Sequence, residues 1–140
     1  MMLENLKKLE KYINSELSSK IHNSAINNDE LLIEVGENDL TEVVQFVKSN
    51  EKLKFRQLID IAGVDYPEEE KRFNLIYLFL SHENNSRLKL LVKFETSQAI
   101  NSITKIFPSA NWMEREVFDM YGIKFKNHPD LAKNINRLRI

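Results

Sequence analysis

The residues most able to carry chemistry are three carboxylates, Glu114, Glu116 and Asp119, in a short charged segment near the C-terminus. Two carboxylates can act as general acid and general base when both face one substrate. On a helix, Glu114 and Glu116 would point roughly 200° apart, because each residue advances the helix by about 100°. The spacing therefore argues against a catalytic dyad, and we expect no catalytic residue in this chain.

Metal binding is the second kind of chemistry that this spacing tests. Glu116 and Asp119 lie three residues apart and could together hold an ion, but the only histidine close to them is His128. The three histidines of the chain are 60 and 46 residues apart, so none forms the H-x-x-x-H pair of helical metal sites. An ion pair with Arg115, or with an arginine of a partner, is the simpler interpretation. We therefore expect no metal site.

Cysteine and glycine usage excludes further kinds of site. The chain has no Cys and three Gly. Without sulfur there is no disulfide, no cysteine-held zinc or iron–sulfur cluster and no thiolate nucleophile. Loops that cradle phosphate need several neighbouring glycines, whereas Gly36, Gly63 and Gly122 are isolated. A dinucleotide-binding fold and a P-loop are excluded, and any redox cofactor should belong to another chain.

Length and charge indicate one soluble domain over residues 1–140. This is the usual size of a single domain, and 20 Lys and Arg against 21 Asp and Glu leave a net charge of -1. A surface so balanced has no overall attraction for nucleic acid or anionic lipid. No apolar run approaches the ~20 residues that span a bilayer, and the N-terminus lacks the apolar core of a signal peptide. We expect a cytosolic protein.

The charged segment near the C-terminus has the pattern of one helix, Trp112 to Tyr121. Asn111 can cap its N-terminus, and Glu114 lies three residues further on, where it would complete a capping box. Gly122 can adopt the left-handed backbone conformation that ends a helix. The sequence thus predicts both ends of this helix.

The two faces of this helix differ in polarity. At about 100° per residue, one stripe is formed by Met113, Val117, Met120 and Tyr121. Glu114 and Glu116 lie on the two flanks of the stripe. Arg115 and Asp119 lie opposite it, at the i,i+4 spacing of an ion pair.

Two more helices are predicted earlier in the chain and a third directly before Pro108. Apolar residues at three- and four-residue steps predict a helix over 3–19. Asp39 and Glu42 have the spacing of a capping box, which predicts a second helix over 40–50. Three isoleucines spaced by three predict a helix over 96–107.

Strands are predicted where the apolar period falls to two. The expected strands cover residues 31–35, 58–64, 74–80 and 88–94. The last two form a hairpin, and 74–80 is apolar on both faces, as in a central strand. The segment 22–29 is interpreted as a polar link. The fold class is α+β: a single domain with a mainly antiparallel sheet covered by helices, and an extended C-terminal tail.

The chain beyond Gly122 is basic. It has five cations against one carboxylate, Asp130: Lys124, Lys126, Lys133, Arg137 and Arg139. A solvated tail is the simplest interpretation, and a tail that lies on an acidic protein partner is the second. Nucleic-acid binding is the third, because no aromatic side chain that could stack on bases follows Phe125.

The same segment resembles a known family signature. The matching runs are Asn111-Trp112-Met113-Glu114-Arg115-Glu116, Phe118-Asp119-Met120-Tyr121-Gly122-Ile123, Phe125 and His128-Pro129-Asp130-Leu131. They resemble the signature of the C subunit of respiratory NADH:quinone oxidoreductase, complex I. The similarity covers about residues 30–131, since Asp60-Ile61, Gly63-Val64-Asp65 and the hairpin also resemble that family.

The resemblance implies a cofactor-free α+β subunit of the peripheral arm, with no active site of its own. It would support electron transfer from NADH to quinone coupled to proton translocation, while FMN and iron–sulfur clusters are carried by other subunits. Its partners would be the large quinone-site subunit and other peripheral-arm subunits, without nucleic acid and without direct membrane insertion. Its place would be the cytoplasmic side of the bacterial inner membrane, or the matrix side in a mitochondrion.

The resemblance also implies which residues serve structure and assembly rather than catalysis. They are Glu114, Arg115, Glu116, Asp119, Tyr121, Gly122, His128, Pro129 and Asp130. Family members usually continue with an Arg pair and a segment that wraps the neighbouring subunit, whereas here Leu131 is followed by Ala132-Lys133-Asn134-Ile135. We therefore expect residues 132–140 to be a divergent or truncated tail.

Two alternatives stay open. The first is the equivalent subunit of a related membrane-bound hydrogenase or ferredoxin-fed complex, which would share the fold and the signature. The second, from another class, is a small nucleic-acid-binding module that uses the basic end of the chain, recognisable by a steep dependence of affinity on salt.

Overall fold

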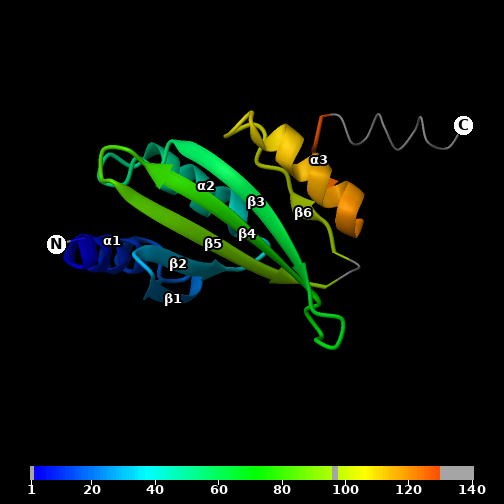
Figure 1. Cartoon of the computed structure of the whole chain (residues 1–140), viewed down its shortest axis with the longest axis horizontal. Coiled ribbons are helices and arrows are strands. Elements are labelled where there is room, and N and C mark those ends of the chain that lie inside the picture. The colour runs from blue at the N-terminus through cyan, green and yellow to red at the C-terminus, as the bar shows by residue number, and fades with distance from the viewer. Residues whose placement is uncertain (1, 96–97, 130–140) are drawn as a thin grey trace, which may run out of the picture.

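The structure is a computed structural model that describes residues 2–95 and 98–129. Its helices and strands follow one another along the chain (Figure 1): α1 (Met2–Glu16), β1 (Ile21–Asn27), β2 (Glu30–Val35), α2 (Leu40–Ser49), β3 (Gln57–Asp65), β4 (Phe73–Ser81), β5 (Ser86–Phe94), β6 (Ile100–Asn101), α3 (Ala110–Tyr121) and β7 (Phe125–Lys126). The predicted helices over 3–19, 40–50 and 112–121 and all four predicted strands are present, with their ends moved by a few residues.

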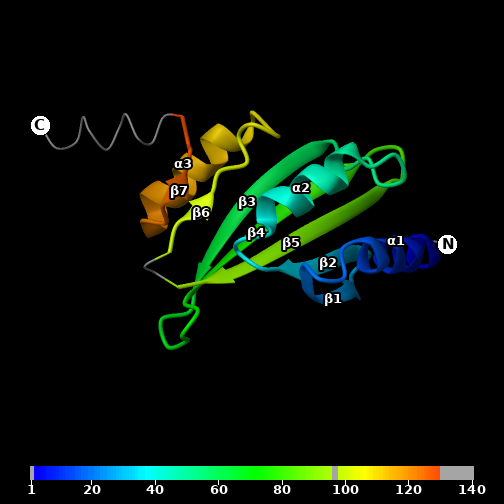
Figure 2. The same ribbon diagram turned by 180° about the vertical axis from the view of Figure 1, so that it is seen from behind.

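Five strands form the main sheet, in the order β1-β2-β5-β4-β3. Neighbouring strands are antiparallel, except that β2 runs parallel to β5. The helix α2 lies on one face of the sheet, behind the strands in Figure 1 and in front of them in Figure 2. The prediction of an α+β domain with a mainly antiparallel, helix-covered sheet is confirmed, while the predicted tail, 130–140, lies outside the described residues.

Alternation along the strands determines which side chains enter the core. On β4, Leu75, Tyr77 and Phe79 are fully buried, whereas the residues between them are only half-buried on the opposite face. The flanking strands β3 and β5 place β4 inside the sheet, which is the central position predicted from its apolar sequence. The face that holds Tyr77 is buried, so a polar group on that face is shielded from water.

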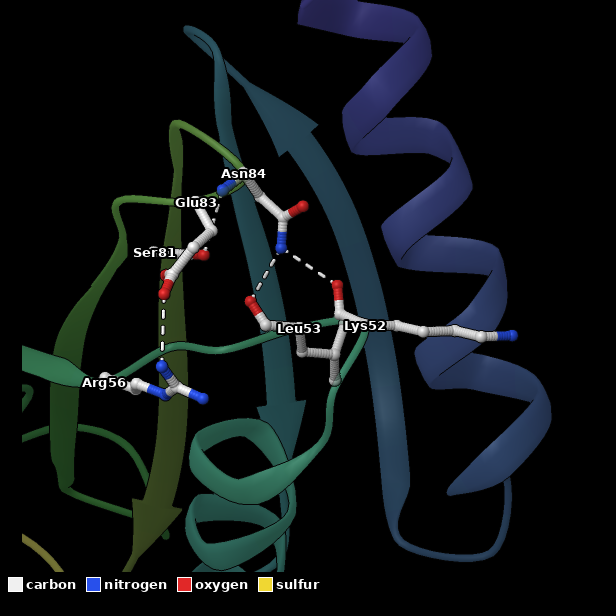
Figure 3. Close-up of polar contacts among 6 residues, drawn as sticks. All are labelled: Lys52, Leu53, Arg56, Ser81, Glu83 and Asn84. Atoms are coloured by element: carbon white, nitrogen blue, oxygen red, sulfur yellow. Dashed lines mark hydrogen bonds and ion pairs between the residues drawn. The ribbon is translucent and has the colours of Figure 1, made fainter.

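The turn of the β4–β5 hairpin is fastened to two distant parts of the chain. Asn84 Nδ2 donates hydrogen bonds to the carbonyl oxygens of Lys52 and Leu53 at 2.9 and 2.8 Å (Figure 3). Asn5 Nδ2, on α1, donates to the carbonyl oxygen of Asn84 at 3.1 Å. One turn therefore joins α1, the connection from α2 to β3, and the sheet.

The predicted polar link over 22–29 is wrong, because most of it belongs to β1. This strand pairs antiparallel with β2 through a turn at Asn28 and Asp29, whose φ angles are 51° and 63°. Asn and Asp tolerate positive φ better than most residues, and a two-residue turn of this kind suits a hairpin. As an edge strand with mostly half-buried or exposed residues, β1 has no apolar alternation that a search for period two could detect.

The predicted helix over 96–107 is also wrong, apart from residues 96 and 97, which lie outside the described residues. The segment contains β6 followed by turns, and β6 pairs in parallel with β7. Its isoleucines point inward as the pattern suggested, since Ile100, Ile103 and Ile106 are all buried. Successive turns can place apolar residues at a spacing of three, as a helix does. Here the backbone N–H of Ile103 donates to the Glu114 side chain of α3 instead of to a carbonyl oxygen within a helix.

Candidate functional site

The charged helix α3 begins earlier than predicted, and both predicted capping boxes are wrong. Its first residue is Ala110, with Ser109 rather than Asn111 at the N-cap position. At α2, Asp39 does occupy the N-cap position, but its side chain makes no capping hydrogen bond. Since α3 is not capped by Asn111, Glu114 has no capping partner to reach back to.

The side chain of Glu114 points into the protein. It is fully buried, on the same face of α3 as Ala110 and Val117. Its Oε2 accepts a hydrogen bond from the backbone N–H of Ile103 at 2.8 Å. Burial raises the pKa of the Glu114 carboxyl, although hydrogen bonds from Ser102 and Ile103 and the nearby His128 favour its charged form. A buried carboxylate is costly unless it is hydrogen-bonded, and these partners are what make its position tenable.

The ring of His128 lies beside Glu114, and both side chains are fully buried. His128 Nε2 is 3.9 Å from Glu114 Oε1 and 3.1 Å from the carbonyl oxygen of Asn111. Tyr77 is a third buried polar residue in this region, and burial, followed by the charge of Glu114, raises the pKa of its hydroxyl well above the usual value. Among the described residues, neither Tyr77 Oη nor Glu114 Oε1 has a hydrogen-bond partner.

The C-terminal end of α3 is attached to β3 through Tyr121. A Cβ atom on Gly63 would lie 2.8 Å from Tyr121 Cε2, so the ring is in contact with the backbone of β3. The ring also lies 6.4 Å from that of Phe73, in an edge-to-face arrangement. Gly122 then ends the helix as predicted, with φ at 72° and its N–H donating to the carbonyl oxygen of Phe118 at 2.8 Å.

The opposite face of α3 exposes large apolar side chains. Trp112 is 66% exposed and Met120 is 73% exposed, and with Glu116 between them they form one row at a spacing of four. The predicted apolar stripe is therefore wrong at Met120, although Val117 and Tyr121 do pack inward. An exposed Trp on a helix is unusual enough to require a reason.

Three charged residues complete this outer face: Arg115, Glu116 and Asp119, all exposed. Within the part of the chain that the structure describes, no ion pair joins Arg115 to Asp119. The predicted pair is thus absent, and the guanidinium is presented to solvent. These three residues, together with Trp112 and Met120, form the outer face of α3.

The two glutamates of α3 do not face one site. Glu114 is buried and Glu116 is exposed, so the two carboxylates face different surroundings, as the helical spacing predicted. Over residues 2–95 and 98–129, no group of three or more His, Asp and Glu side chains could hold a metal ion. What the helix offers is an inner face tied to the domain and an outer face available to another molecule.

The structure brings together some of the predicted site residues and separates others. Glu114 and His128 meet in the core, Tyr121 and Gly122 hold the end of the helix, and Pro129 is exposed directly after His128. Asp130 lies outside the described residues, as do the tail cations from Lys133 onward.

Sequence reasoning missed three participants in this region: Gly63, Tyr77 and Ile103. Each comes from a strand or loop outside α3, and its contact with the helix or with Glu114 arises only in the folded protein. The one available signal was Gly63, an isolated glycine within a predicted strand, which often marks a close approach.

No helix among the described residues is long and apolar enough to cross a membrane.

Comparison with known proteins shows the family to which this chain belongs. Residues 33–137 match the sequence model of the respiratory-chain NADH dehydrogenase 30 Kd subunit family. This match includes all of α3 and extends back to β2.

Two relatives are each named as the C subunit of NADH-quinone oxidoreductase. The one from Chelativorans sp. strain BNC1 is 39% identical over 132 residues, which cover 94% of this chain and 66% of that protein. The one from Ruegeria pomeroyi is 47% identical over 104 residues, which cover 74% of this chain and 52% of that protein. The chain thus spans between half and two thirds of the length of these relatives.

Two solved structures share the fold. The trypsin-resistant fragment 1–134 of Nqo5 is 27% identical, with a TM-score of 0.75 over 94% of this chain and all of that one. A chain of a membrane-bound sulfane sulfur reductase, described as an archaeal respiratory membrane complex, is 19% identical with a TM-score of 0.76 over 89% of this chain and 72% of that one. At 19% identity the second likeness shows the fold alone.

Proposed function

The chain belongs to the respiratory-chain NADH dehydrogenase 30 Kd subunit family, and on that premise we propose that it is a structural subunit of an NADH-quinone oxidoreductase. In this role it has no active site. It assembles into the peripheral arm, on the cytoplasmic side of a bacterial inner membrane or the matrix side in a mitochondrion. Electron transfer from NADH to quinone, coupled to proton translocation, then takes place on cofactors, FMN and iron–sulfur clusters, that belong to other subunits.

The observation that carries this proposal is the outer face of α3. A helix that is anchored by a buried Glu114 and still exposes 66% of Trp112 and 73% of Met120 has apolar surface that its own domain does not use. Tryptophan, methionine and arginine are enriched at protein interfaces, and tryptophan and arginine often contribute most of the binding energy. We assign this face to docking on the large quinone-site subunit, with Arg115 paired to an acidic group of that partner.

The test is co-purification of the partner subunits with tagged full-length chain. Trp112→Ala should weaken docking at least about tenfold, because truncating a central interface tryptophan commonly costs about 2 kcal/mol or more. Arg115→Ala should weaken it as well, since a carboxylate of the partner would be left buried without its counter-ion. Arg87→Ala is the matched control, because Arg87 is an exposed arginine on β5 rather than on α3.

Retention of the partner subunits at the wild-type level by both α3 variants would contradict the docking face. Absence of the wild-type chain from the purified complex would contradict the proposed function itself. If the α3 variants lose the partner subunits and Arg87→Ala retains them, the result supports both the docking face and the proposed function. Measuring NADH:quinone activity of membranes from a deletion strain, complemented with each variant, shows whether the contact matters to the enzyme.

A further inference from the structure

Glu114 connects the chain segment before α3 with the segment after it. On one side, its Oε2 holds the N–H of Ile103, in the turn that follows β6. On the other side, its Oε1 lies 3.9 Å from Nε2 of His128, two residues after β7. Both side chains are fully buried, so the contact is made inside the protein and not on its surface.

The segment that carries His128 is joined to the chain before α3 by a short ribbon of two strands. Its strand β7 is two residues long, and so is its partner β6. The backbone hydrogen bonds that flank this ladder run from Ile100 N to Lys124 O at 3.0 Å and from Ser102 N to Lys126 O at 2.9 Å. Such a short two-stranded ribbon is marginal on its own. Side chains must supply the remaining stability.

The side chains that do so are buried residues of the same segment. Ile123, Phe125 and His128 are buried, whereas Lys124 and Lys126 are exposed. The two apolar residues hold the segment by burial alone, which has no directional preference. His128 adds direction, because its ring is 3.1 Å from the carbonyl oxygen of Asn111 in the first turn of α3 as well as close to Glu114.

We propose that Glu114 and His128 form a latch that locks residues 123–129 onto α3. The latch closes at the N-terminal end of α3, next to Trp112. Glu114 and His128 are positioning residues in this scheme, and the latch exists in the isolated chain whether or not a partner is bound.

The test is limited trypsin digestion of the purified full-length chain, followed by mass spectrometry to give the rate at each site. Lys124 and Lys126 are trypsin sites on the latched segment, and Lys71, in the exposed β3–β4 loop, is an internal reference. Proteolysis of a folded protein follows local opening. His128→Ala should accelerate cleavage at Lys124 and Lys126 by about tenfold or more while leaving Lys71 unchanged.

Two variants distinguish a latch from general damage. His128→Gln keeps an N–H that can reach the Asn111 carbonyl, so its cleavage rate should fall between wild type and His128→Ala. His82→Ala is the matched control, because His82 is exposed and its Nε2 lies 2.8 Å from Gln57 Oε1, in another part of the molecule. It should leave the rates at Lys124 and Lys126 at the wild-type level.

Wild-type rates at Lys124 and Lys126 in His128→Ala would overturn the latch. Equal acceleration at Lys71 would also overturn it, because that result describes loss of stability throughout the domain. If His128→Ala yields no folded protein, the same comparison is made with Glu114→Gln, which keeps an acceptor for the Ile103 amide. Acceleration confined to the latched segment is then expected, and unchanged cleavage would overturn the proposal.

Discussion

The helices α2 and α3 differ in what they bury and what they expose. In α2 the buried residues are Leu40, Val43, Val44 and Val47, and the exposed ones are polar. In α3 a carboxylate, Glu114, is buried, while Trp112 and Met120 are exposed. The sequence of α2 is explained by the core of its own domain. The docking face proposed above would account for the exposed apolar residues of α3.

The largest expected effect is on the free energy of unfolding, and it tests the contrast between the buried residues of α2 and the exposed residues of α3. Leu40→Ala, at a fully buried site of α2, should lower the free energy of unfolding by about 2–5 kcal/mol, because it leaves a cavity. Trp112→Ala removes more atoms, yet it should change that free energy by no more than about 0.5 kcal/mol, because the side chain is exposed. Urea denaturation of the isolated chain measures both. A large loss for Trp112→Ala would mean that the outer face of α3 supports the fold and is not reserved for a partner.

An intermediate effect is expected where α3 meets β3. Gly63→Ala places a methyl group 2.8 Å from the ring of Tyr121, and this overpacking should cost about 1–3 kcal/mol of stability. Gly36→Ala is the matched control, since its nearest atoms would be 3.3 Å away, on the side chains of Asp39 and His22. Thermal denaturation compares the two variants. Equal stability of the two would show that the ring of Tyr121 moves aside without cost.

The smallest expected effect concerns the charge of Glu114. Because its folded-state pKa is raised above the ordinary value of 4.5, the unfolded chain ionises first as the pH increases. Stability contributed by this group is therefore complete below pH 4.5 and is lost as the pH rises toward the folded-state pKa. Glu114→Gln does not ionise and should lack this loss. Urea denaturation of both proteins between about pH 4 and pH 8 measures the difference, and a wild type that gains stability over Glu114→Gln with rising pH would contradict the assignment.

The parts of the fold that could be predicted are those whose signal is local and repeated. Apolar periodicity located α1, α2 and the strands β2 to β5, and Gly122 located the end of α3 because a left-handed residue is a local requirement. The strand β1 was missed because an edge strand with few buried residues has no periodicity to detect. The segment before Pro108 was assigned to a helix because a spacing of three does not distinguish helix from turns.

In the candidate site, too, the features set by local sequence could be predicted, and those set by contacts with other segments could not. The signature residues could be located in the sequence, and the opposition of Glu114 to Glu116 followed from helical geometry alone. Which of the two carboxylates is buried could not be predicted, because the partners of Glu114, the Ile103 amide and His128, come from other segments. The exposure of Met120 was missed for a related reason. The helical spacing predicts that Met120 faces the core, whereas its side chain is 73% exposed.

The parallel pairing of β2 with β5 also determines the order in which this chain can fold as it is made. It places Glu30 beside Arg87, and every residue between them must leave the ribosome before the two strands can meet. Until then β2 has an unpaired edge, and the apolar side chains of α1 to α2 that are buried in the folded protein are exposed. Non-local pairing of this kind slows folding and exposes an edge on which other chains can pair. We therefore expect the edge of β2 that pairs with β5 to stay open in the nascent chain until the β4–β5 hairpin has been synthesised.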